Sequence, residues 1–252
     1  MSGAADAIWH DVECGSYDAD LKLWEELAER AGDPVLELGC GTGRVALHLA
    51  RRGHRVYGLD RDPVLLAALA KRASDSQHSG VGQESAAPLG VEPVRAEAGA
   101  FELPEPVALA LAPMQFLQLL PSPQLLPCLR CVAAALQPGG LLAAAIVESL
   151  PRVDEPLTPL PDVREIDGWV YSSLPVAAAT AEERIVLRRL RQTVSPDGEL
   201  REEDDEIQLR TFSAEALEGE AGQAGFALAG RRVIAETDAH VGSTVVLLKR
   251  GA

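Results

Sequence analysis

The chain has 252 residues, of which 47% are hydrophobic and only 4% aromatic. It is long enough to bury a full core, which must consist mainly of leucine, valine and alanine. Its 23 basic and 38 acidic side chains leave a formal net charge of −15, which disfavours nucleic acids and acidic membranes as partners.

The N-terminal third alternates helices and strands. Apolar residues recur at helical spacing before Asp33, and short apolar runs bounded by glycine or proline are typical of buried strands. Asp62 is placed to cap a helix whose first residue is Pro63. The expected elements are helix 18–31, strand 35–38, helix 44–52, strand 54–59 and helix 63–72. This order predicts a parallel sheet with helices on its faces.

The next part of the chain continues this pattern up to residue 147. We expect a loop at 74–90, strands at 92–96, 107–111 and 141–147, a helix at 122–137 and a turn at 138–140. Cys128 and Cys131 form a C-x-x-C on that helix, but no second pair and no paired histidines accompany them. We therefore interpret them as buried thiols and expect no metal site.

After a proline-rich connector, residues 163–210 lack helical periodicity and predict antiparallel strands. The run Ser195-Pro-Asp-Gly198 is typical of a hairpin turn. If Ser195 faces Gly198, Arg189 lies opposite Asp204, and such pairs explain the arginine-rich strand better than a substrate-binding role. A bulge at Gly198 would shift this register by one residue. The expected last elements are helix 213–224 and strands 226–234 and 243–249.

The strand at 35–38 runs directly into three alternate glycines, Gly39, Gly41 and Gly43. Glycines let the backbone approach a ligand closely, and the helix that follows offers free N–H groups, so this pattern indicates a nucleotide-binding loop. A dinucleotide fingerprint counted from Gly39 requires a glycine at position 44, which is Arg44. The spacing therefore departs from the dehydrogenase pattern.

This G-x-G-x-G loop, with Glu37 two residues before it, resembles motif I of the class I S-adenosylmethionine (SAM) dependent methyltransferases. The resemblance implies an α/β fold: a Rossmann-like, doubly wound, mostly parallel seven-stranded sheet, here with an antiparallel β insertion near residues 160–210. The expected division is a single domain over 1–252, with an N-terminal helical cap (1–31), a SAM-binding core (32–149), the insertion as an acceptor lid (150–210) and the end of the core sheet (211–252).

The resemblance also implies cofactor contacts, which gather where adjacent parallel strands end and line one crevice. Asp60 would bind the ribose hydroxyls, Glu37 the methionine amino group, and Glu97 the adenine. A buried carboxylate at Glu37 is costly without a cationic partner. The full set of expected cofactor residues is Tyr17, Glu37, Gly39, Cys40, Gly41, Gly43, Asp60, Arg61, Glu97, Ala98, Leu111 and Ala112.

The implied reaction is methyl transfer by in-line displacement to a nitrogen or oxygen of a small-molecule acceptor, as in glycine or sugar amine N-methyltransferases. The candidates for a catalytic role are His10, Tyr17, Gln115, Glu148 and His240.

Other classes of function stay open. One is a catalytically silent SAM-binding regulatory module, and another is an NAD-dependent oxidoreductase, against which Arg44 argues. RNA methylation is opposed by the negative charge. We expect a cytoplasmic protein, because the sequence shows no signal peptide and no run long enough to span a membrane. The sequence leaves open whether the protein is a homo-oligomer.

Overall fold

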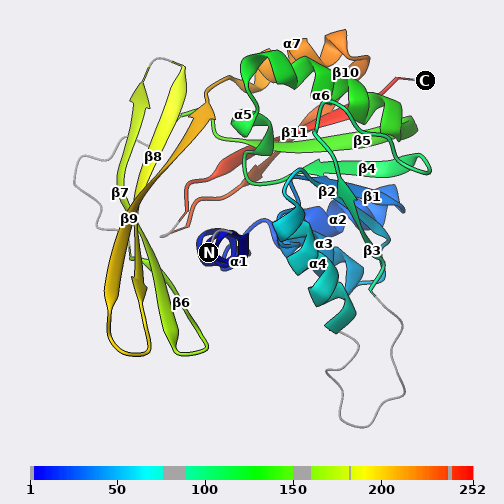
Figure 1. Ribbon diagram of the computed structural model, residues 1–252. Helices are drawn as coiled ribbons and strands as arrows, with labels where there is room; N and C mark the ends of the chain where they lie inside the picture. The colour runs from blue at the N-terminus through cyan, green and yellow to red at the C-terminus, as the bar shows by residue number, and fades with distance from the viewer. Residues whose placement is uncertain (1–2, 76–88, 150–159, 182, 238–239, 252) are drawn as a thin grey trace.

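The computed structural model describes residues 3–75, 89–149, 160–181, 183–237 and 240–251, which form two sheets and their helices. Helix α1 (Gly3–Cys14) stands between the two sheets, with the larger α/β layer on one side and the smaller antiparallel sheet on the other (Figure 1). No helix within the described ranges is long and apolar enough to cross a membrane. Helix α1 contacts elements on both sides.

The larger sheet has the strand order β10-β11-β5-β4-β1-β2-β3. Strands β1 to β5 run parallel, and β11 and β10 close one edge in antiparallel pairing. The bounds are β1 (Val35–Leu38), β2 (Val56–Asp60), β3 (Val91–Arg95), β4 (Val107–Ala112), β5 (Leu136–Ile146), β10 (Phe226–Ile234) and β11 (Ser243–Arg250). This confirms the predicted doubly wound, mostly parallel seven-stranded sheet. It also places the carboxyl ends of β4, β1 and β2 side by side.

Helices cover both faces of this sheet. Successive side chains of a strand point to opposite faces, so Val35 packs against one helical layer and Leu36 against the other. One layer contains α2 (Leu21–Ala31), α3 (Arg44–Ala50) and α4 (Pro63–Asp75), and the other contains α5 (Phe116–Leu119), α6 (Ser122–Ala135) and α7 (Ala214–Gln223). As expected, Asp62 caps α4 by accepting a hydrogen bond of 2.7 Å from the Val64 N–H.

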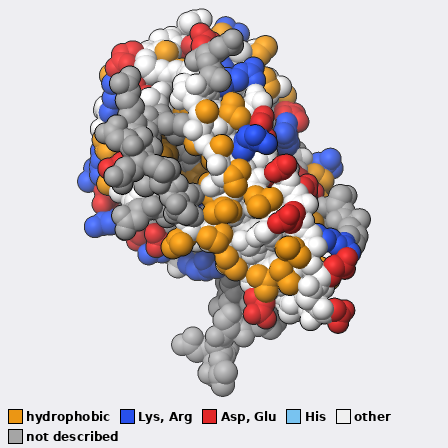
Figure 2. Space-filling model, turned by 90° about the vertical axis from the view of Figure 1, so that its left-hand side faces the viewer, with side chains coloured by type: hydrophobic (Ala, Val, Ile, Leu, Met, Phe, Trp, Pro, Cys, Tyr) orange, Lys and Arg blue, Asp and Glu red, His pale blue; other side chains and the backbone are white. Residues whose placement is uncertain are grey.

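The smaller sheet is antiparallel throughout, in the order β6-β7-β8-β9, which confirms the predicted β insertion. Its strands are β6 (Asp162–Ile166), β7 (Trp169–Ala181), β8 (Arg184–Val194) and β9 (Leu200–Arg210). Seen from this side of the molecule, hydrophobic side chains gather among acidic and basic ones (Figure 2). Val163, Val176 and Leu200 are exposed hydrophobic residues of this sheet.

The primary register expected for the hairpin of β8 and β9 is wrong by one residue. Arg189 lies opposite Asp205, not Asp204. The Ser195 N–H donates to the Glu199 carbonyl at 2.9 Å, and Gly198 has a φ of +86°, so the turn holds one more residue than a tight two-residue turn. The bulge at Gly198 therefore sets the register, because only glycine adopts this backbone conformation without strain.

The expected turn at 138–140 is also wrong, because these residues lie inside β5. The pairing of β4 with β5 shifts between Val107 opposite Leu136 and Leu109 opposite Leu141, so the intervening residues bulge out of the ladder. Helix α2 begins at Leu21, three residues later than expected from residue 18. Most of the expected loop at 74–90 and most of the proline-rich connector lie outside the described residues.

Gly43, which precedes α3, and Gly53, which follows it, provide a matched test of packing around this helix. Both have a φ of +94°, but a Cβ at Gly43 would overlap the buried Leu69 side chain, whereas a Cβ at Gly53 meets open space. We expect Gly53→Ala to lower the free energy of unfolding by about 1 kcal/mol through backbone strain alone. Gly43→Ala should lower the free energy of unfolding by about 1–3 kcal/mol more, because the added Cβ overpacks the site. Equal losses in urea unfolding would contradict this account.

Candidate functional site

The loop that follows β1 is shaped by backbone hydrogen bonds to the end of β2. The Gly41 N–H donates to Asp60 Oδ2 at 3.0 Å, and the Cys40 N–H donates to the Leu59 carbonyl at 3.0 Å. The other oxygen of Asp60 accepts a hydrogen bond of 2.9 Å from the Asp62 N–H. The Asp60 carboxylate therefore fixes the glycine loop to the start of α4. Each of its oxygens keeps a further lone pair for a ligand.

Two adjoining cavities open at this loop. The first, which we call the β2–β3 cavity, has a volume of about 250 Å³ and is lined by Asp60, Arg61, Glu97 and Ala98 beyond the ends of those strands. The second, the intersheet cavity, has a volume of about 430 Å³ and extends from the end of β1 and α1 to the smaller sheet. The residues that line both are His10, Gly39, Leu65, Phe116 and Leu119. One elongated ligand can therefore contact both.

Glu37 carries a buried carboxylate that no side chain neutralises within the described part of the chain. Its side chain lines the intersheet cavity, and its Oε2 atom has no hydrogen-bond partner. Burial raises the pKa of Glu37 to about 8. The expected protein cation is elsewhere, because Arg44 binds both oxygens of Asp20 at 2.6 and 2.7 Å. The Ala46 N–H donates to this carboxylate, but the Oε2 atom is left for a cationic group of a ligand.

The glycine loop is covered by side chains from two other elements. A Cβ on Gly41 would overlap the His10 imidazole, and a Cβ on Gly39 would overlap the Phe116 ring. His10 also lies 3.2 Å from Thr42 through its Nδ1 atom. Glycine is needed at both positions because these side chains approach the backbone closely.

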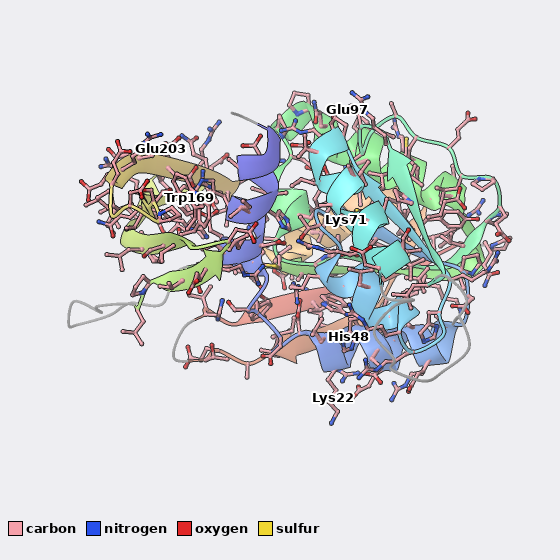
Figure 3. The ribbon with its side chains drawn as sticks, turned by 60° about the horizontal axis from the view of Figure 1, so that its bottom comes forward. Lys22, His48, Lys71, Glu97, Trp169 and Glu203 are labelled. Carbon is pink, nitrogen blue, oxygen red and sulfur yellow. The ribbon has the colours of Figure 1, made fainter. Side chains whose placement is uncertain are left out.

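Helix α1 is held over the loop by the buried carboxylate of Asp11. This carboxylate accepts a hydrogen bond of 2.6 Å from Thr42, pairs with both terminal nitrogens of Arg72 on α4, and lies 3.3 Å from Arg164 on β6. Burial opposes its ionisation, but the bonds from Arg72 and Thr42 outweigh burial and lower its pKa. Figure 3 shows α1 between the sheet that carries Trp169 and Glu203 and helix α4, which carries Lys71.

Residues 35–140 match the family model of a methyltransferase domain. This match spans less than half of the chain and shows that the segment is similar to a methyltransferase domain. The CcbJ methyltransferase from Streptomyces caelestis superposes with a TM-score of 0.68 over 99% of this chain and 98% of that one, at 21% identity. The sugar N-methyltransferase KedS8 from a Streptoalloteichus species superposes with a TM-score of 0.71 over 98% and 93%, at 18% identity.

Similarity to curated sequences is confined to short segments. The S-adenosyl-L-methionine-dependent Diels-Alderase iccD from Talaromyces variabilis is 56% identical over 48 residues, which are 17% of this chain. The matched segments span only 16% and 12% of the two curated relatives found. The structural comparisons therefore establish the fold of the chain.

Seven of the residues expected at the site line neither of the two cavities. Tyr17 is buried against His240, with ring centroids 4.6 Å apart, and lies beneath Arg44. Glu148 borders a separate shallow pocket beside β10 and β11. The complete set outside both cavities is Tyr17, Gly41, Gly43, Leu111, Ala112, Glu148 and His240. Of the catalytic candidates, only His10 and Gln115 line the intersheet cavity.

The corner after β4 carries the predicted candidate Gln115 and also Phe116, which the sequence pattern did not single out. Met114 and Gln115 have positive φ values of 46° and 59°, so the chain turns sharply before α5. Gln115 donates a hydrogen bond of 2.9 Å to the Ser243 hydroxyl. This turn brings Phe116 against the glycine loop. Pro113, which follows the last residue of the strand, is the sequence signal for this corner.

The arginines of β8 do not simply pair across the hairpin. The buried carboxylate of Glu13 on α1 accepts bonds from Arg191 at 2.7 and 2.9 Å, Arg189 at 3.0 Å and Ser173 at 2.9 Å. Arg191 also lies 3.0 Å from Asp205, so one cross-strand ion pair does form. The prediction that cross-strand pairing explains the cluster is therefore incomplete. Arg189 and Arg191 both bind Glu13, and both line the intersheet cavity.

The Asp11 contacts predict how stability depends on pH. Asp11→Asn should lower the free energy of unfolding by about 2 kcal/mol at neutral pH, because it leaves two partly exposed arginines without their shared carboxylate. Since folding lowers the pKa of Asp11, its stabilisation is full above the ordinary value of 3.8 and is lost as the pH falls toward the lower folded-state pKa. Urea unfolding should therefore show the difference shrinking on acidification. Asp6→Asn, exposed on the same helix, is the control, and an equal deficit there would contradict the assignment.

Proposed function

We propose that this protein transfers a methyl group from SAM to a nitrogen or oxygen of a small-molecule acceptor. The observation that carries the proposal is the buried Glu37 carboxylate, which lines the intersheet cavity and whose Oε2 atom has no hydrogen-bond partner among the described residues. When bound, SAM supplies a methyl group that its positively charged sulfur has already activated. The cationic amino group of its methionine moiety supplies the positive charge that balances the Glu37 carboxylate.

The two adjoining cavities support this assignment. In the β2–β3 cavity, Asp60 offers carboxylate lone pairs for a ribose diol, and Glu97 and Ala98 border the space expected for adenine. Gly39 and Phe116 lie where the two cavities meet, which places the methionine side toward Glu37. The residues present therefore fit SAM, with its nucleoside and amino acid ends in different cavities.

The acceptor is assigned to the remainder of the intersheet cavity. Its volume of about 430 Å³ is in the range that holds a small organic molecule, and residues of the smaller sheet form its far wall. This supports a role for that sheet in covering the acceptor, and the division of the chain into cap, core and lid stays a prediction. The cytoplasmic location also stays a prediction.

His10 is the side chain best placed to accept a proton from an acceptor. It lines both cavities, and burial lowers its pKa, so its imidazole is neutral at pH 7. An amine acceptor needs no base once it is deprotonated, whereas a hydroxyl acceptor does. Alignment of the acceptor with the methyl group supplies much of the rate in either case. Release of S-adenosylhomocysteine during turnover distinguishes this enzyme from a catalytically silent SAM-binding module.

Removing the Asp60 carboxylate tests the nucleoside contact. We expect Asp60→Ala to weaken SAM binding by about 10- to 100-fold, the loss typical of hydrogen bonds to a charged group. Isothermal titration calorimetry measures this directly. Asp62→Ala is the matched control, because it removes the cap of α4 at a cost of about 1 kcal/mol in stability but should leave SAM affinity unchanged. Wild-type affinity in Asp60→Ala would refute the assignment.

Glu37 predicts a proton release on binding. Its pKa of about 8 in the free protein means that it is mostly protonated at neutral pH, and the ammonium group of SAM favours the carboxylate. Binding should therefore release close to one proton, and affinity should rise as the pH climbs toward about 8. Calorimetry in buffers of different ionisation enthalpy measures this release. It should disappear in Glu37→Gln and with 5′-methylthioadenosine, which lacks the amino group, and its persistence in either case would contradict the role of Glu37.

A further inference from the structure

The intersheet cavity combines an apolar wall with a charged group at its sheet side. Leu187 and Arg189 are two residues apart on β8, so both project toward α1 and the cavity. Ile207 and Leu209 do the same on β9. An acceptor in this cavity therefore meets leucine and isoleucine side chains beside the guanidinium of Arg189.

The other two arginines that line this cavity are already bound. Arg44 gives both terminal nitrogens to Asp20. Arg191 uses Nε and Nη2 for Glu13 and lies 3.0 Å from Asp205 through Nη1. Neither has its charged group left for a ligand.

Arg189 differs, because most of its hydrogen-bonding capacity is unused. Within the described residues its one partner is Glu13, at 3.0 Å through Nη1. A guanidinium has five N–H donors in a planar fork, so several remain. The side chain is only 16% exposed and lines the intersheet cavity. Donors in such a partly enclosed, largely apolar site are costly unless oxygen atoms accept from them.

Among the described residues, no other acidic side chain of the cavity accepts a hydrogen bond from the remaining N–H groups of Arg189. Glu13 already accepts four hydrogen bonds, from Arg189, Arg191 and Ser173. Glu37 belongs to the other end of the cavity, and Asp6 is exposed. Asp205 lies opposite Arg189 on β9 but forms its ion pair with Arg191, at 3.0 Å.

We propose that Arg189 binds an oxyanion, a carboxylate or a phosphate, of the methyl acceptor, whose apolar body packs on Leu187, Ile207 and Leu209. Planar guanidinium groups bind both kinds of oxyanion through paired, charge-assisted hydrogen bonds. This inference rests on the proposed function, because only methyl transfer makes the bound molecule an acceptor. The preference of Arg189 for an oxyanion is measurable separately from methyl transfer.

The test compares matched ligands that differ in charge. The probes are 3-phenylpropionate, 2-phenylethyl phosphate and the neutral 3-phenylpropan-1-ol, each titrated with and without saturating S-adenosylhomocysteine. We expect at least one anionic probe to bind the wild type tenfold or more tightly than the alcohol, and the two anions show whether carboxylate or phosphate is preferred. Arg189→Gln should abolish this preference. Arg188→Gln, exposed on the opposite face of the same strand, should retain it.

Each result decides one claim. Equal affinity for the acids and the alcohol in the wild type, or an unchanged preference in Arg189→Gln, overturns the inference. If Arg189→Gln does not fold, Arg189→Lys keeps the charge without the fork and should reduce the preference; an undiminished preference there overturns the paired geometry. If the protein prefers the anion but does not bind S-adenosylhomocysteine, this inference stands and the proposed function is refuted. If it binds S-adenosylhomocysteine but does not prefer the anion, only this inference is refuted.

Discussion

Ionic attachment of one helix to two sheets is the constraint on which the site depends. Asp11 and Glu13 are two residues apart on α1, so their side chains point about 200° apart around the helix. Asp11 bonds to Thr42 and Arg72 on the α/β side, and Glu13 bonds to Arg189 and Arg191 on the side of the smaller sheet. The intersheet cavity exists because α1 holds these layers at a fixed separation. The same contacts place His10 over the glycine loop and direct both arginines inward.

Local patterns predicted the core of the fold well. The strand at 35–38, the glycine loop and the cap of α4 are decided within a few residues, and their periodicity and turn residues are legible in the sequence. The register of the β8–β9 hairpin depended on the backbone conformation of one residue, Gly198, and so did the bulge in β5 on Gly139. The hairpin register was predicted one residue away, and residues 138–140 were predicted as a turn before β5, because the sequence does not show which glycines adopt a positive φ.

The site was harder to predict because its charged side chains form ion pairs with residues that are far away in the sequence. Arg191 lies 178 residues from Glu13 along the chain, so pairing with the nearby acids of β9 was the natural expectation. Arg44 lines the same cavity as Glu37, yet it binds Asp20, whose carboxylate also accepts a hydrogen bond of 2.7 Å from Trp24. Tyr17 and His240 were each candidates and instead stack on one another. Such choices are made by tertiary packing, which no local spacing encodes.

The glycine loop has a further consequence for how its motif should be interpreted. Added Cβ atoms at Gly39, Gly41 and Gly43 would collide with Phe116, His10 and Leu69, which come from three different elements. The protein's own packing thus demands glycine at all three positions, whether or not a ligand is present. A descendant that had abandoned its ligand would still inherit the full pattern. In this fold the carboxylate that the interior leaves unneutralised is the more telling mark of a retained activity than the glycines beside it.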